Sequence, residues 1–201
     1  GMPWLWQEKN FMQKYSHHIL TVGISLLTNF GRARNQPITE AARYSGAIAE
    51  FLGNDPAKAC AEINSLHSRT GFLSRKTPEL HVTLVFTSTD SGKLCASLIE
   101  KELKRHKVAV HKLPIRGLNA PARDLTPEFA ARESAESLAD LRQRIIDHVA
   151  RLQKAIPPPV IELNITGGYK AECAVVYELG RALRLPVYYL HETFKVSVLL
   201  P

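Results

Sequence analysis

The sequence lacks the signatures of several protein classes. Its 201 residues include only three cysteines, which form no CxxC pair and have no histidine at metal-ligand spacing beside them. A disulfide framework and a structural zinc site are therefore disfavoured, and we expect no metal and no cofactor. No apolar run approaches the roughly 18 residues of a membrane span, and the N-terminus has no signal-peptide layout. These absences predict a cytoplasmic protein with no membrane partner, in which the cysteines are small buried hydrophobic residues.

The motifs of the common nucleotide enzymes are absent as well. Gly-x-Gly-x-x-Gly does not follow the first predicted strand, where 21–25 reads Thr-Val-Gly-Ile-Ser, and there is no Walker sequence. An ordinary dehydrogenase or P-loop enzyme is therefore disfavoured. Lysine and arginine outnumber aspartate and glutamate by 26 to 19, which gives a net charge of +7. This surplus favours an anionic partner without identifying it.

What the sequence does contain is a regular alternation of strand-like and helix-like segments. Strands are predicted at 18–22, 80–87, 108–113, 160–166 and 186–190, followed by an extended segment at 194–200. Helices are predicted within 38–68, from the turn at 88–92 to about 106, from 126 towards 156, and at 169–184. The alternation predicts an α/β, Rossmann-like, doubly wound and mainly parallel sheet with helices on both faces.

Some helix boundaries are marked by particular residues. The region 38–68 is expected to hold two helices broken at 53–56, with Asp55 as the N-cap and Pro56 at the first helical position. A long amphipathic helix should begin at Thr126 and end before the three prolines at 157–159. Its apolar stripe consists of Leu138, Leu141, Ile145, Val149 and Leu152.

The chain is expected to hold one domain. Residues 1–17 are predicted to be an N-terminal extension in which Gly1 before Met2 is a tag remnant, and 18–201 the Rossmann-like domain with a helical insertion at about 118–156. Loops at 23–29, 87–92 and 166–170 leave predicted strand ends. In doubly wound sheets, ligands bind at that edge. A second, effector domain beyond the end of this chain is an open alternative.

The stretch 160–170 is the most informative part of the sequence. A β-branched run enters Thr166-Gly167-Gly168, and a helix begins at Lys170. Two glycines let the backbone lie close to a ligand, because no Cβ intervenes. The unpaired amides and the positive dipole end of the helix attract an anion, and the lysine adds a full charge. These features predict a phosphate-binding site.

Four segments together resemble the CRISPR-associated Rossmann-fold (CARF) family. They are Thr-Val-Gly-x-Ser-Leu-Leu-Thr-Asn at 21–29, Thr-Ser-Thr-Asp-Ser-Gly at 87–92, Asn-Ile-Thr-Gly-Gly-Tyr-Lys at 164–170 and Pro-Val-Tyr-Tyr-Leu-His-Glu at 186–192. The resemblance implies a homodimer that binds cyclic oligoadenylate across its two-fold axis in antiviral defence, with tetra-adenylate favoured over hexa-adenylate. Some members of this family cleave the ring.

The resemblance also implies roles for individual residues. Ser25 and Lys170 match the catalytic pair of the ring-cleaving members, in which a ribose 2′-hydroxyl attacks its own phosphate without a metal. The ligand-binding positions that it implies are Gly23, Asn29, Ser88, Asp90, Thr166, Gly167, Gly168 and Tyr169. Asn29 would bond an adenine edge or a sugar, and Tyr169 would either stack on adenine or belong to the core, as aromatic residues at helix starts often do.

Other readings stay open at this point. The domain could be a ligand sensor without catalysis, whose HEPN ribonuclease or DNA-binding output domain is missing, or an unrelated nucleotide-binding enzyme. Lys170 could be a solvated residue and Ser25 could cap the turn that follows it. His191 and Glu192 are expected to have a structural or dimer-interface role. Arg32 and Arg34 could clamp a phosphate or could be solvated residues. Arg142 and His148 match the spacing of the HEPN nuclease signature, but a nuclease site at this pair is disfavoured.

Overall fold

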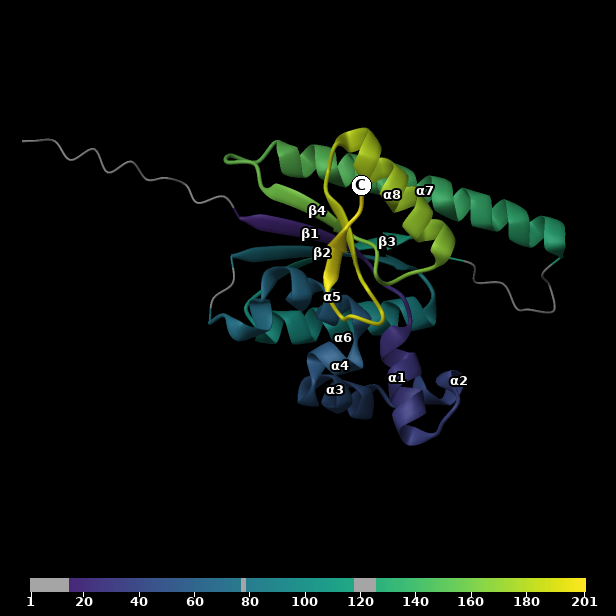
Figure 1. Cartoon of the computed structure of the whole chain (residues 1–201). Helices are drawn as coiled ribbons and strands as arrows, with labels where there is room; N and C mark the ends of the chain where they lie inside the picture. Colours follow the sequence, from purple (N-terminus) through teal and green to yellow (C-terminus); the bar gives the residue numbers. More distant parts are fainter. Residues whose placement is uncertain (1–14, 77–78, 118–125) are drawn as a thin grey trace, which may run out of the picture.

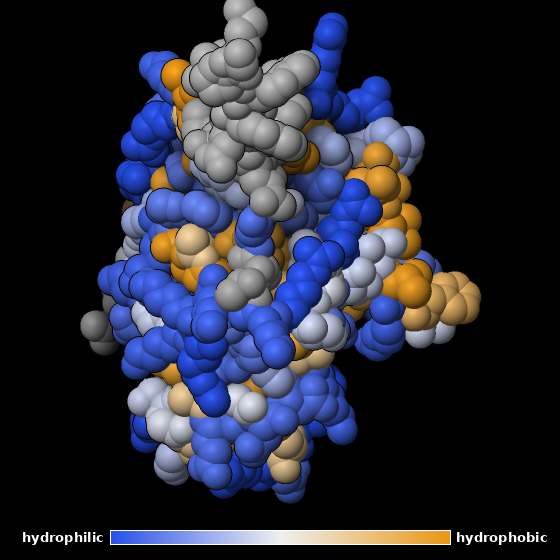
Figure 2. Space-filling model, turned by 90° about the vertical axis from the view of Figure 1, so that its left-hand side faces the viewer, coloured by the Kyte–Doolittle hydropathy of each residue, from blue (hydrophilic) through white to orange (hydrophobic). Residues whose placement is uncertain are grey.

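A computed structural model of the chain describes residues 15–76, 79–117 and 126–201. Most of the predicted N-terminal extension, residues 1–14, lies outside these ranges, as does the 118–125 part of the predicted insertion. Among the described residues, no helix is both long and apolar enough to cross a membrane. Figure 2 shows a mostly hydrophilic surface on the side that faces left in Figure 1.

The core of the fold is a six-stranded sheet with the order β3-β2-β1-β4-β5-β6. The strands β1 to β5 run parallel, and β6 pairs with β5 in the antiparallel direction. Their bounds are β1 Ser16–Thr21, β2 Leu80–Thr87, β3 Ala109–Ile115, β4 Val160–Asn164, β5 Val187–Leu190 and β6 Ser197–Leu199. The predicted Rossmann-like, mainly parallel sheet is confirmed.

Helices cover both faces of this sheet (Figure 1). One face carries α7 and α8, and the other carries the helices between β1 and β3. Their bounds are α1 Ser25–Arg34, α2 Ile38–Ala41, α3 Ser45–Asn54, α4 Pro56–Ala59, α5 Ala61–Thr70, α6 Asp90–Arg105, α7 Pro127–Gln153 and α8 Lys170–Leu183, with a 3₁₀ turn η1 at Phe72–Ser74. The α7 helix connects β3 to β4, and its predicted apolar stripe packs on the sheet.

Local capping signals were reliable guides to helix starts. Asp55 accepts a hydrogen bond from the amide of Lys58 at 3.1 Å, as an N-cap does, and Pro56 occupies the first position of α4. Thr126 accepts from the amide of Phe129 at 3.1 Å at the start of α7. Both predicted starts are confirmed because these interactions involve residues close in sequence.

Several predicted boundaries are wrong. The segment predicted as a loop at 23–29 becomes helical at Ser25, because Leu26, Leu27 and Phe30 bury one face of α1 in the core. The two helices expected within 38–68 are four, since the chain also breaks before Ser45 and at Cys60, which adopts an extended conformation. The strand predicted at 160–166 ends at Asn164, and β3 extends past Pro114, which an edge strand tolerates.

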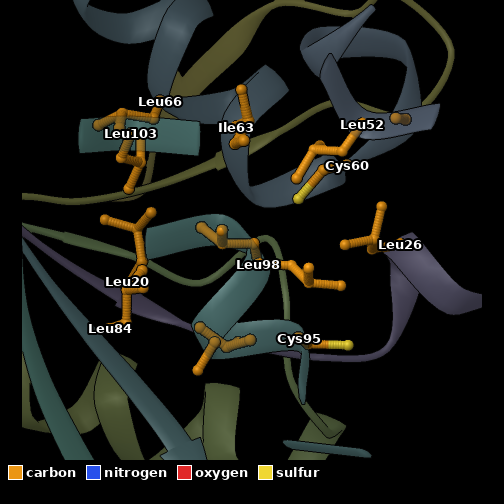
Figure 3. Packing of buried hydrophobic residues seen from close by; sticks show 14 of the residues in the cluster. Leu20, Leu26, Leu52, Cys60, Ile63, Leu66, Leu84, Cys95, Leu98 and Leu103 are labelled. Atoms are coloured by element: carbon orange, nitrogen blue, oxygen red, sulfur yellow. The ribbon is translucent and has the colours of Figure 1, made fainter. Parts of the chain in front are cut away.

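Two apolar clusters hold the layers together, one on each face of the sheet. Figure 3 shows part of the cluster beneath α1, α3, α5 and α6, in which Cys60 and Cys95 lie among leucine and isoleucine side chains. All three cysteines are free, and burial raises the pKa of the Cys95 thiol to about 12. The prediction of buried cysteines holds for Cys60 and Cys95, whereas Cys173 is only half-buried.

Candidate functional site

The candidate site lies at the switch point of the sheet, between β1 and β4. Strand order reverses there, and β1 passes into α1 at the same edge where β4 passes into α8 (Figure 1). The loop after β1 and the turn after β4 therefore meet in space. Ligands of doubly wound sheets bind beyond the carboxyl ends of the strands at such a point.

Hydrogen bonds from neighbouring elements fix the turn after β4. The hydroxyl of Thr21, the last residue of β1, donates to the carbonyl of Gly167. The Asn164 side chain accepts from the amide of Thr166 at 3.0 Å and donates to Ser65 Oγ on α5 at 2.7 Å. Gly168 has a φ of +92°, a conformation that side chains with a Cβ rarely adopt. The shape of the turn is thus set both by glycine and by three surrounding elements.

Glu62, in the first turn of α5, lies between the two loops. Its carboxylate is 1% exposed and accepts from the Gly23 amide at 2.7 Å, from Ser25 Oγ at 2.8 Å and from Cys60 Sγ at 3.1 Å. A Cβ at Gly167 would collide with this carboxylate, and one at Gly23 would lie 2.6 Å from the Gly168 nitrogen. Glycine is required at these places because the loops and the carboxylate are in contact.

Ser25 is more constrained than the sequence suggests. Its hydroxyl donates to Glu62, and its oxygen accepts from the amide of Ala61 at 3.1 Å, which is the first residue of α5. Ser25 therefore caps α5 and not the turn that follows it, so that alternative is wrong. One lone pair of Ser25 Oγ is left for a ligand.

Hydrogen-bond donors gather at the start of α8. Among the described residues, no acceptor forms a hydrogen bond with the backbone amide of Gly167 or Gly168. Lys170 occupies the first position of α8, is exposed, and forms no ion pair within the described part of the chain. The free amides, the helix dipole and the ammonium group all favour an anion at this place.

Two pockets flank the turn at 166–169. The first, which we call the α5–β5 pocket, has a volume of 560 Å³ and is lined by Asn29, Asn64, Thr166 and the residues from Tyr189 to Thr193, among others. The second, the α7–α8 pocket, has a volume of 400 Å³ and is lined by residues that include Thr87, Thr89, Glu133, Tyr169 and Glu172. Polar groups line both pockets, and the turn separates them.

The predicted ligand-binding residues divide between these pockets. Asn29 lines the α5–β5 pocket and donates to the carbonyl of Ala59 at 3.0 Å, and Thr166 accepts from the amide of Leu190 at 2.9 Å. Tyr169 is 62% exposed at the rim of the α7–α8 pocket. Ser88 lies on the loop after β2, on the far side of β1 from β4, and Asp90 is the first residue of α6.

The remaining side chains that the sequence singled out have structural contacts. His191 Nδ1 accepts from the amides of Thr193 and Phe194 at 3.2 and 3.3 Å, so it shapes the β5–β6 turn. Arg142 pairs with Glu178 at 2.8 Å, whereas His148 points into the sheet and contacts Thr83 Oγ1 at 2.7 Å. The Arg142 and His148 side chains therefore make separate contacts and do not form one nuclease site. Arg32 and Arg34 are exposed in the last turn of α1.

Glu62 is the functional candidate that sequence reasoning missed. The sequence does contain a signal for it, because a glutamate at this place interrupts the apolar positions Ala59, Cys60, Ile63 and Leu66, all of which are buried. A buried glutamate is rare unless it is bonded. Within the described ranges, no group of three or more histidine, cysteine, aspartate or glutamate side chains is arranged to hold a metal ion.

Comparison with known proteins places the chain in a family. The family described as CRISPR-associated protein (Cas_APE2256) matches residues 57–201, which include Glu62, the turn after β4 and Lys170. No curated protein matches the chain. The family match takes in well over half of the 201 residues. The chain therefore belongs to the CRISPR-associated protein family Cas_APE2256.

Proposed function

We propose that this CRISPR-associated protein binds a cyclic oligoadenylate across the two-fold axis of a homodimer and cleaves the ring. The observation that carries the proposal is the set of donors at the switch point. Within the described part of the chain, the amides of Gly167 and Gly168, just before α8, and Lys170, its first residue, have no partner, and Ser25 is linked to the same turn through Glu62. Such a set suits a phosphodiester, which is anionic and accepts hydrogen bonds.

The two pockets beside the turn support a ring of four nucleotides. Each chain has one pocket on either side of its turn at 166–169, so a two-fold dimer would have four. A ring with four bases could place one base in each pocket while its phosphates lie over the two turns. Asn29 in the α5–β5 pocket offers an amide to a base edge, and the exposed ring of Tyr169 offers a stacking surface in the other. Cyclic tetra-adenylate is therefore the ligand that we favour.

Cleavage would follow from positioning and charge. A ribose 2′-hydroxyl attacks the adjacent phosphorus, the bond to the 5′-oxygen breaks, and the products end in a 2′,3′-cyclic phosphate. Lys170 and the glycine amides would stabilise the negative charge that develops on the phosphate oxygens. Ser25 would orient the attacking hydroxyl. Both reacting groups belong to the ring, so the step needs no co-reactant.

A direct experiment tests binding and cleavage separately. The purified protein is mixed with labelled cyclic tetra- and hexa-adenylate, binding is measured by calorimetry, and products are separated by chromatography with and without a chelator. We expect tight binding of one ring per two chains and cleavage that the chelator does not affect. Absence of binding to both rings would refute the proposal. A protein that remains monomeric with and without ligand would refute the dimer.

Binding without cleavage is the second candidate function, and one observation favours it. The hydroxyl hydrogen of Ser25 is already donated to Glu62, so Ser25 cannot donate to a phosphate in this arrangement. A sensor of this kind would bind the ring and leave it intact for hours. The chromatographic assay above distinguishes this outcome from cleavage.

A further inference from the structure

The buried carboxylate of Glu62 is an unusual group to find at an anion-binding site. It is 1% exposed, and no lysine, arginine or histidine in the described residues pairs with it. Its negative charge is compensated by hydrogen bonds from Gly23, Ser25 and Cys60 and by its position in the first turn of α5. These bonds tie the loop after β1 to α5, but a buried charge is costly, and here it also opposes an incoming phosphate.

The geometry around Ser25 gives the carboxylate a route to the ligand. The Ser25 hydroxyl donates to Glu62 Oε2, with 2.8 Å between the two oxygens, and the amide of Ala61 donates to one lone pair of the serine oxygen. The remaining lone pair can accept a proton. Ser25 thus meets a ribose hydroxyl as an acceptor, and the proton that it already carries has a carboxylate to go to.

We propose that Glu62 is the positioning residue of the cleavage reaction and receives the proton of the attacking 2′-hydroxyl through Ser25. This inference rests on the ring cleavage proposed above. As the 2′-oxygen bonds to phosphorus, its proton moves to Ser25 Oγ, and the Ser25 proton moves to Glu62. The 5′-oxygen leaves and takes a proton from the Lys170 ammonium group. Glu62 then returns its proton to Lys170 through water, so the cycle closes without an oxidant, reductant or co-reactant.

Other titratable groups near the site are held in different interactions. Glu172 accepts from the amide of Tyr169 at 3.2 Å on the opposite side of the turn. His191 Nδ1 is occupied by two backbone amides of the β5–β6 turn. Asp90 is the first residue of α6, after β2. Within the described residues, Glu62 is the carboxylate that bonds to Ser25, which is why we assign the role to it.

The test compares Glu62→Gln with Glu102→Gln in single-turnover cleavage of cyclic tetra-adenylate. Glu102 is a suitable control because it is also a buried carboxylate, 5% exposed, but it pairs with Arg105 and His106 at the C-terminal end of α6, outside the site. We expect Glu62→Gln to lower the rate by about 10²–10⁴-fold with affinity nearly unchanged. The control variant should retain the wild-type rate. Ser25→Ala should add little to the loss in Glu62→Gln, because the two residues act as a unit.

A further measurement separates proton transfer from a structural role. If Glu62→Gln does not fold, the wild-type cleavage rate can be measured in mixtures of H₂O and D₂O. A relay through Ser25 moves more than one proton, so the rate should depend on the fraction of D₂O along a curve. Cleavage by Glu62→Gln at the wild-type rate, or a linear dependence, would overturn the relay alone. A wild type that leaves the ring intact would refute the proposed cleavage itself.

Discussion

Acidification should destabilise this fold through three buried histidines. His17 in β1 and His148 in α7 both contact the hydroxyl of Thr83 at 2.7 Å, and the rings of His81 and His111 lie beside His17. On the other face of the sheet, His18 contacts the hydroxyl of Tyr188 at 2.8 Å and lies near the Arg69–Glu162 pair. Within the described residues, His17 Nδ1 has no hydrogen-bond partner.

The magnitude follows from the pKa values of these groups. Burial, reinforced by neighbouring histidines, lowers the pKa of His17 to about 3. Burial together with Arg151 lowers the pKa of His148 to about 4, and burial lowers that of His18 to about 4. In the unfolded chain these pKa values are about 6.5, so between pH 7 and pH 5 the unfolded state takes up protons that the folded state does not. The loss is roughly 2 kcal/mol for each histidine and about 6 kcal/mol in all, a large share of a typical domain's stability.

Chemical denaturation at pH 7, 6 and 5 measures this loss. The free energy of unfolding should fall with decreasing pH over this range, because the unfolded state binds more protons. In His148→Gln the fall should be smaller, since one of the three groups no longer titrates. His111 is exposed, so His111→Gln should retain most of the fall in the free energy of unfolding. Equal free energies of unfolding at pH 7 and pH 5 in the wild type would refute the reasoning.

Other predictions concern the candidate site. Lys170→Ala should weaken binding of cyclic tetra-adenylate, measured by calorimetry, by about 1.5–3 kcal/mol. The control Lys154→Ala, at another exposed lysine, should bind as the wild type does. An unchanged affinity in Lys170→Ala would make Lys170 an ordinary surface residue. Ser25→Ala should lower single-turnover cleavage by about 10²–10³-fold and affinity far less, and an equal loss in both would contradict a catalytic role. Gly168→Ala should destabilise the fold by about 1–2 kcal/mol in denaturant unfolding, because its φ is +92°. The control Gly46→Ala, where an added Cβ in α3 meets open space, should not destabilise the fold. Equal stabilities of the two variants would refute this account of the turn.

Local features of the fold could be predicted because their causes are close together in sequence. The N-cap at Asp55, the start of α7 after Thr126 and the glycine turn before Lys170 each depend on residues within a few positions. The stripe on α7 was visible because a helix of period 3.6 buries a recurring set of positions. Polar composition wrongly predicted a loop at 23–29. The burial of Leu26 and Phe30 in the core stabilises a helix there, and α1 begins at Ser25.

The sequence by itself therefore determined the α/β alternation, the mainly parallel sheet and the glycine turn after β4. Only the tertiary structure decided which side chains meet. Ser25 and Glu62 are 37 positions apart, and His17 and His148 share Thr83 although they belong to different layers. The direction of β6 was also left open by the sequence. The reason is physical: periodicity and capping report how each segment is buried, whereas the pairing of distant polar groups depends on which strands become neighbours when the layers pack.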